Sequence, residues 1–431
     1  MLKILTVLPH GICGAGVTRN SIDLTEYINS LDNTKINADC IANNDISFGL
    51  RSKSFDSIKT FSFLNDTDNL KKYIDAFDII ICTGAISKNR STEEKINFIN
   101  LLDYIKSKNK MLIYINLDHK KSALNCRMFA EKEYINMFEK FDLIFNYSHQ
   151  NDFCKKIIEP ANINVKTILC RGDKNIENIY GIDFDKIKSN YWKETTDKQY
   201  KTIKYLGRTN VYKGPYLVRD LHYKYFMNDG WITTIEGIDL LIGALVELYS
   251  EIKPDKIPRP DVNLTYIKQN KANISRIDNN QTVFERNSPA YVMPIFTNKN
   301  GLERLSKCQF GIELITFTGR NERFNKDVIE NAMLEYVAVG CIPIFKKYWA
   351  EQFIIGGKTL ISYGDNAGTI FLDENNPEEA MQLMNKLADN PTMYDEWRNK
   401  AFNFYKKYYD VKNIYSIMLK NILEIFKTIK K

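Results

Sequence analysis

The residues best placed to do chemistry are two cations on one short loop, Arg208 and Lys213. An apolar strand ending at Leu206 and Gly207 runs into this loop, and a helical pattern beginning with Pro215 follows it. Pro is favoured at the first helical position, where the backbone N–H groups have no partner within the helix. Cations beside a helix N-terminus can bind a diphosphate. Solvated cations on an ordinary strand–loop–helix connection are the alternative interpretation.

Two carboxylates occur near a second glycine later in the chain. Glu330 and Glu335 lie in a helical pattern over residues 326–339, and Gly340 separates this pattern from an apolar strand over 342–345. A carboxylate on a helix can accept hydrogen bonds from both hydroxyls of a ribose. A glutamate on the solvent face of an amphipathic helix is the alternative.

Three polar clusters follow apolar strands in the first half of the chain. They are Gly14 and Gly16 with Val17 and Thr18, Asp118 with His119, and Ser148 with His149. Ligands of parallel α/β sheets bind at the carboxyl ends of strands, where these clusters should lie. The glycines allow close approach of the backbone to a ligand, but their spacing matches neither the dinucleotide fingerprint nor the P-loop. A tight turn and structural histidines are the alternatives.

Alternating strand and helix patterns must position these groups. In the first half, continuous apolar runs predict buried parallel strands at 2–8, 77–82, 111–116 and 141–145, with helices at 20–31 and 91–107. The alternation restarts at 203 and adds strands at 310–314 and 342–345, with helices at 326–339, 377–387 and 392–431, the last as one or two helices. The sequence therefore predicts an α/β protein with two Rossmann-like domains facing across a cleft.

The domain boundaries follow from the same patterns. We expect a first domain over 1–190, a second over 200–400, and a C-terminal helix or helices over 401–431 that could pack back on the first domain. Residues 174–199 are polar and weakly patterned, which is typical of a connection between domains.

Composition narrows the class of protein. The 431 residues carry a formal net charge of +7, with 44% hydrophobic and 26% charged residues, as in ordinary globular proteins. The eight Cys form no CxxC pair and no cluster with His, so neither a structural zinc site nor a disulfide framework is indicated. No signal peptide and no run of 18 apolar residues is present. We expect a cytoplasmic protein that does not cross a membrane.

The Arg-x4-Lys spacing and the later Glu resemble those of retaining glycosyltransferases with the GT-B fold. In that group the Arg and Lys hold the donor diphosphate, and a Glu before an Ala-x-Gly-x-Pro segment holds the donor ribose. Here the corresponding segment is 338–343, which follows Glu335 and has one more residue between the Gly and the Pro. Many members carry another acidic residue eight positions before that Glu, and Asp327 occupies this position.

A closer resemblance is to the DNA alpha-glucosyltransferases of T-even bacteriophages, which move glucose from UDP-glucose onto 5-hydroxymethylcytosine in DNA. The blocks that carry it lie at 14–18, 116–119, 148–153, 189–193, 207–214, 302–307, 330–343 and 371–375. The resemblance implies a UDP-sugar as donor substrate, no cofactor, no required metal, and double-stranded DNA with modified bases as partner. A host-cell cytoplasmic monomer is expected.

The resemblance also implies roles for individual residues. Arg208, Lys213 and Asp118 would be catalytic: the cations neutralise the leaving group, and the carboxylate faces the acceptor hydroxyl or stabilises an oxocarbenium-like sugar. The substrate-binding residues would be Gly14, Gly16, Val17, Thr18, His119, Ser148, His149, Gly207, Glu330 and Glu335. Two other functions stay open: transfer to a bacterial cell-surface polymer, lipid or protein, and non-catalytic binding of a nucleotide sugar or nucleic acid.

Overall fold

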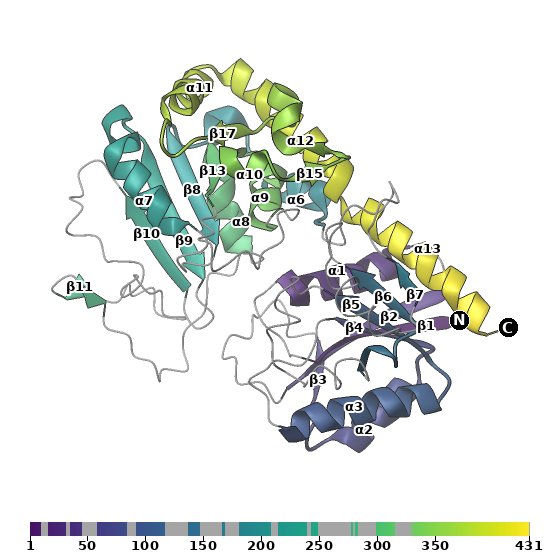
Figure 1. Cartoon of the computed structure of the whole chain (residues 1–431). Coiled ribbons are helices and arrows are strands. Elements are labelled where there is room, and N and C mark those ends of the chain that lie inside the picture. Colours follow the sequence, from purple (N-terminus) through teal and green to yellow (C-terminus); the bar gives the residue numbers. More distant parts are fainter. Residues whose placement is uncertain are drawn as a thin grey trace. The chain divides into compact units, whose positions relative to one another are not determined.

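The chain folds into two compact units in the computed structural model, and each unit is described by itself (Figure 1). The first contains the described residues up to Gly181 and those from Val411 onward, and the second contains those from Ile182 to Asp410. The structure describes residues 1–9, 16–31, 35–44, 58–83, 92–116, 137–146, 166–168, 181–207, 214–238, 243–248, 277–278, 281–282, 299–314, 329 and 331–430.

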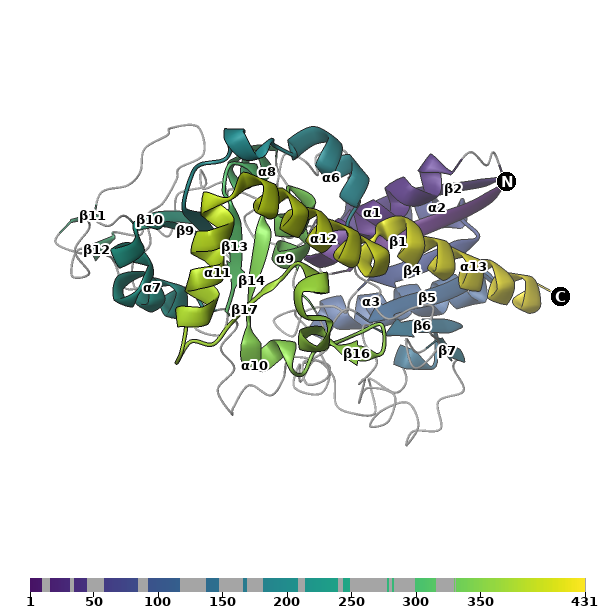
Figure 2. The ribbon, with the colours of Figure 1, turned by 90° about the horizontal axis from the view of Figure 1, so that it is seen from above.

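A seven-stranded parallel sheet forms the centre of the first unit, in the order β3-β2-β1-β4-β5-β6-β7. Figure 2 shows this sheet with its strands following one another from β2 to β7. The strands are β1 Leu2–Leu8, β2 Ile36–Asn43, β3 Lys59–Phe61, β4 Ile79–Thr83, β5 Met111–Asn116, β6 Leu143–Asn146 and β7 Lys166–Ile168. Strands such as β4 are buried along their whole length, as their continuous apolar sequences require.

Helices cover both faces of the first sheet. α2 (Thr67–Asp75) and α3 (Thr92–Ser107) pack on one face, where Leu70 and Phe98 contact the core. On the other face lie α1 (Gly16–Ser30) and α13 (Val411–Ile429), which bury Leu24 and Ile414 against the sheet (Figure 1). The last helix of the chain therefore completes the core of the first unit.

The second unit is built on a six-stranded sheet in the order β10-β9-β8-β13-β14-β17. All neighbours are parallel except β9 and β10. The strands of this sheet are β8 Thr202–Gly207, β9 Ile232–Ile238, β10 Gly243–Leu248, β13 Phe310–Glu313, β14 Ile342–Lys346 and β17 Ile370–Leu372. Two short antiparallel pairs lie outside it: β11 Ile277–Asp278 with β12 Gln281–Thr282, and β15 Ile354–Ile355 with β16 Lys358–Thr359.

The helices of the second unit also divide between two faces. α7 (Pro215–Lys224) and α11 (Glu378–Asp389) share one core with β8 and β13, whereas α6 (Phe184–Tyr191), α8 (Lys299–Ser306) and α9 (Asn331–Ala338) share the other. The first turns of α12 (Pro391–Tyr409) join the α7 core, and its later turns join the α9 core. Shorter helical segments are η3 Thr195–Asp197, η5 Phe226–Asp229, α10 Lys347–Ala350 and η7 Leu360–Ala367.

The predicted α/β class and the predicted strands are confirmed by these sheets. The boundary between units differs from the expected one, since it falls after Gly181 and not near residues 190–200. The reason is α6, which buries Phe184 and Ile187 in the second unit although its surroundings are polar in sequence. Among the described helices, none is long and apolar enough to cross a membrane.

The packing of α13 gives a first prediction. Ile422 is fully buried between α13 and the first sheet, so Ile422→Ala should leave a cavity and lower the free energy of unfolding of the first unit by about 3 kcal/mol. Urea denaturation followed by circular dichroism measures this. Lys420→Ala, on the exposed side of the same helix, is the control and should change stability by less than about 0.5 kcal/mol. Equal effects of the two changes would contradict the packing of Ile422 against the first sheet.

Candidate active site

Each sheet reverses its winding between two neighbouring strands. In the first sheet, α1 follows β1 and covers one face, while α3 follows β4 and covers the other. In the second, α7 follows β8 and α9 precedes β14 on the opposite face from α7, so the reversal lies between β8 and β13. Loops part at such a switch point and leave a crevice at the carboxyl ends of the strands, where ligands bind.

The structure describes five of the residues predicted from sequence: Gly16, Val17, Thr18, Gly207 and Glu335. Eight lie outside the described residues, namely Gly14, Asp118, His119, Ser148, His149, Arg208, Lys213 and Glu330. The flanking elements nevertheless show where the chain segments that contain these eight residues leave and re-enter the described part of the structure.

The predicted diphosphate loop joins the elements expected for it. β8 ends at Gly207, next to the reversal point, and α7 begins at Pro215. Gly214 caps this helix with a φ of 82°, in the left-handed region that glycine adopts without strain. Arg208 and Lys213 are therefore joined to the carboxyl end of a central strand and to the N-terminus of a helix.

The first-unit clusters follow strands in the same way. α1 begins at Gly16, so Val17 and Thr18 lie in its first turn, where backbone N–H groups lack helical partners. Asp118 and His119 come shortly after the end of β5, and Ser148 and His149 come shortly after the end of β6. These two strands are neighbours and pair up to their last residues. Both chain segments therefore leave the sheet at the same edge, at the carboxyl ends of β5 and β6.

Glu335 is the predicted ligand-binding side chain that the structure describes in full. It lies on α9, and only 1% of it is exposed, so the alternative of a solvent-facing glutamate is wrong. Glu313, the last residue of β13, is 2% exposed and was missed from sequence. An acidic residue at the carboxyl end of a buried apolar strand was the available signal. Both carboxylates raise the pKa of the buried Tyr336, although desolvation by burial raises it more.

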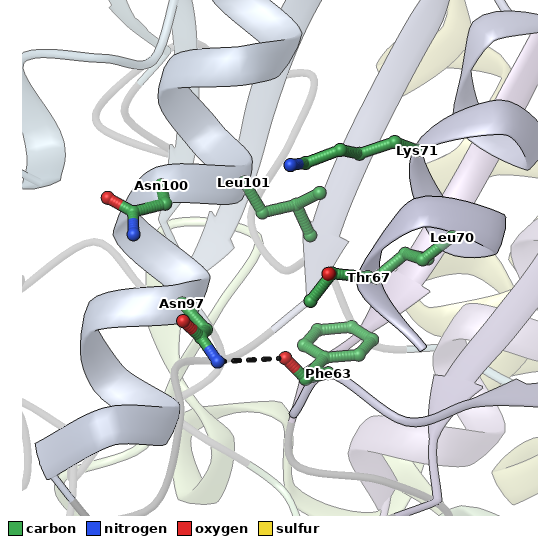
Figure 3. Close-up of a pocket in the computed structure, with 7 residues that line it drawn as sticks. All are labelled: Phe63, Thr67, Leu70, Lys71, Asn97, Asn100 and Leu101. Carbon is green, nitrogen blue, oxygen red and sulfur yellow. Dashed lines mark hydrogen bonds between the residues drawn. The ribbon is translucent and has the colours of Figure 1, made fainter. Parts of the chain in front are cut away.

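Two pockets on the described surface are lined by no predicted site residue. A pocket of about 90 Å³ lies between α2 and α3, where Asn97 donates to the carbonyl oxygen of Phe63 (Figure 3). A wider one of about 530 Å³ lies at the carboxyl ends of β14 and β17, where Lys346 pairs with Glu374. Among the described residues, no group of three or more His, Cys, Asp or Glu is placed to bind a metal ion.

Two units with mainly parallel α/β sheets, each with a switch point, have the architecture of the GT-B fold, and solved structures of that fold superimpose on the chain. A family model described as DNA alpha-glucosyltransferase matches residues 15–391. The chain belongs to the DNA alpha-glucosyltransferase family.

Individual relatives agree with this assignment. The DNA alpha-glucosyltransferase of Enterobacteria phage T4 is 26% identical over 424 residues, which are 95% of this chain and 96% of the relative. A solved alpha-glucosyltransferase in complex with UDP and a 13-mer DNA containing a HMU base superimposes with a TM-score of 0.73 at 22% identity, covering 99% of both chains. Another, with UDP-glucose and DNA containing an abasic site, gives 0.72 at 22% identity, again over 99% of both chains.

The left-handed cap of α7 gives the second prediction. Gly214→Ala should lower the free energy of unfolding by about 1 kcal/mol, because a Cβ is strained at a φ of 82°. Gly230→Ala is a matched control: its φ is 76°, no atom lies within 4 Å of an added Cβ, and the cost should be similar. Gly214→Asn should cost less than Gly214→Ala, since Asn tolerates this conformation. Chemical denaturation measures the stability of all three variants. Wild-type stability of Gly214→Ala would contradict the left-handed conformation of Gly214.

Proposed function

We propose that this protein transfers glucose from UDP-glucose to a hydroxymethylated base in DNA, with retention at the anomeric carbon. The observation that carries the proposal is the match of residues 15–391 to the DNA alpha-glucosyltransferase family. The similar solved structures, which contain UDP, UDP-glucose and DNA, support the same choice of donor and acceptor.

On the donor side, the second unit would hold the nucleotide. The carboxylate of Glu335 accepts hydrogen bonds from the ribose hydroxyls, and Glu330 lines the same pocket. Arg208 and Lys213 bind the diphosphate between the end of β8 and the start of α7. Their charges stabilise the UDP leaving group as its negative charge develops. Gly207 permits close approach of the backbone.

The glycine-rich segment of the first unit would also bind phosphate. Backbone N–H groups at Gly14, Gly16, Val17 and Thr18 face the donor phosphates, at the start of α1 where such groups are free. This placement uses the positive end of the helix dipole.

On the acceptor side, Asp118 would face the hydroxyl of the modified base. It accepts the hydroxyl proton or stabilises positive charge on the sugar ring. The hydroxyl oxygen attacks C1 on the face that the phosphate leaves, the C1–O bond to UDP breaks, and the leaving phosphate helps to take the proton. His119, Ser148 and His149 contact the sugar or the acceptor.

No metal and no cofactor enter this scheme. Neutralisation of the diphosphate is the task that a divalent cation performs in many sugar-nucleotide enzymes, and here Arg208 and Lys213 supply the positive charge. UDP-glucose is a substrate and not a resident group.

The acceptor base lies within a duplex and must leave the stack to reach the donor, at a cost of a few kcal/mol. Lys and Arg contacts to phosphates would make DNA binding depend on salt. We propose that the enzyme acts as a monomer in the host-cell cytoplasm, where DNA and UDP-glucose meet.

A transfer assay gives the third prediction. Radiolabelled UDP-glucose is offered with three duplexes: unmodified, hydroxymethylcytosine-containing and hydroxymethyluracil-containing. Label should enter a hydroxymethylated duplex and not the unmodified one. Binding of UDP-glucose with no label in any duplex would move the proposal to a cell-surface polymer, lipid or protein as acceptor.

The buried carboxylate gives the fourth prediction. Glu335→Gln keeps the side-chain shape but weakens acceptance of two ribose hydroxyls, so KM for UDP-glucose should rise about tenfold to a hundredfold. Glu303→Gln makes the same charge change at an exposed position of α8 and serves as the control, with KM unchanged. Steady-state kinetics measure both KM values. An unaltered KM for Glu335→Gln would contradict the proposed role of Glu335 in binding the ribose.

A further inference from the structure

The two central strands of the second sheet separate before they end. β8 pairs with β9 along its whole length, from Thr202 to Gly207. β13 pairs with β14 along its whole length, from Phe310 to Glu313. Between β8 and β13, however, pairing is confined to Phe310 with Ile203 and Gly311 with Lys204. The gap opens toward the carboxyl ends, at the reversal point of the sheet.

The hydroxyl group of Tyr336 occupies the place of the missing ladder bond. Continuing the register by two residues would pair Glu313 with Leu206, and the Leu206 N–H would then donate to the carbonyl of Ile312. Instead, this N–H donates to the Tyr336 hydroxyl at 2.7 Å. The hydroxyl lies 3.3 Å from the carbonyl oxygens of both Ile312 and Leu206, and it can donate its one hydrogen to either.

The ring of Tyr336 is held as firmly as its hydroxyl. The residue is fully buried, and its ring lies against Gly311 so closely that an added Cβ there would be 2.1 Å from Tyr336 Cγ. Burial also raises the pKa of Tyr336 well above its usual value, so the hydroxyl keeps its hydrogen at ordinary pH. A neutral, buried and hydrogen-bonded hydroxyl is therefore inserted between the two strands.

We infer that Tyr336 is a positioning residue of the donor site, which it serves by holding the carboxyl ends of β8 and β13 apart and by linking them to α9. Its bond to Leu206 anchors the chain one residue before Gly207, where the diphosphate loop begins. Its neighbour on α9 is Glu335, the proposed ribose ligand. One side chain thus sets the distance between the two donor-binding segments. The inference rests on the proposed function.

The test is Tyr336→Phe, which removes one oxygen and keeps the ring beside Gly311. The matched control is Tyr394→Phe. Tyr394 is also fully buried, and its hydroxyl lies 2.6 Å from the carbonyl oxygen of Gln309 and 3.1 Å from that of Gly340, at the opposite, amino ends of β13 and β14. It can donate its one hydrogen to either. Calorimetry measures UDP binding, kinetics measure KM and kcat for UDP-glucose, and thermal unfolding measures stability.

We expect Tyr336→Phe to weaken UDP binding and raise KM about tenfold, with kcat within about twofold of wild type. Tyr394→Phe should lose similar thermal stability while its KM stays within about twofold of wild type. An unchanged KM in Tyr336→Phe, or an equal rise of KM in Tyr394→Phe, would overturn this inference but leave the proposed function standing. So would failure of Tyr336→Phe to fold when Tyr394→Phe folds, because the hydroxyl would then serve stability. Absence of UDP binding by the wild-type chain would overturn the proposed function, and the inference with it.

Discussion

The reversal of winding in each parallel sheet is the constraint on which the rest of the structure depends. Crossovers between parallel strands are right-handed, so the direction in which the next strand is added decides which face a helix covers. β1 and β8 send their helices to one face, and the helices after β4 and β13 belong to the other. Connections therefore diverge at these two places, and polar loops can receive a ligand there without disturbing either core.

Buried polar groups fix the opposite, amino-terminal edge of the sheet in the second unit. Lys198 is buried, and its Nζ donates to the carbonyl oxygens of Ser306 and Cys308, which end α8 and precede β13. Tyr394 bonds the amino ends of β13 and β14 in a similar way. Buried polar groups are costly unless they are paired, so these bonds define one arrangement of the backbone. Burial lowers the pKa of Lys198, which is consistent with a structural role.

Much of this architecture could be predicted because its signals are local. Continuous apolar runs predicted the buried strands, and Gly207 and Pro215 marked the ends of the segment that contains Arg208 and Lys213. Two features could not be predicted in the same way. α6 has only a few apolar residues in a polar stretch, and its burial depends on partners far along the chain. The tail reads as one or two amphipathic helices, and only packing shows that Asp410 separates α12 in one unit from α13 in the other.

The sequence by itself determined the α/β class, the strand–loop–helix that contains Arg208 and Lys213, and the resemblance that indicated the family. Spacing and periodicity act over a few residues, so they can be recognised without the fold. Only the tertiary structure decided that Glu335 is buried and that Tyr336 lies between β8 and β13. These outcomes depend on residues such as Leu206 and Tyr336, which are 130 positions apart and meet because the sheet brings their elements together. Local patterns contain no information about such a contact.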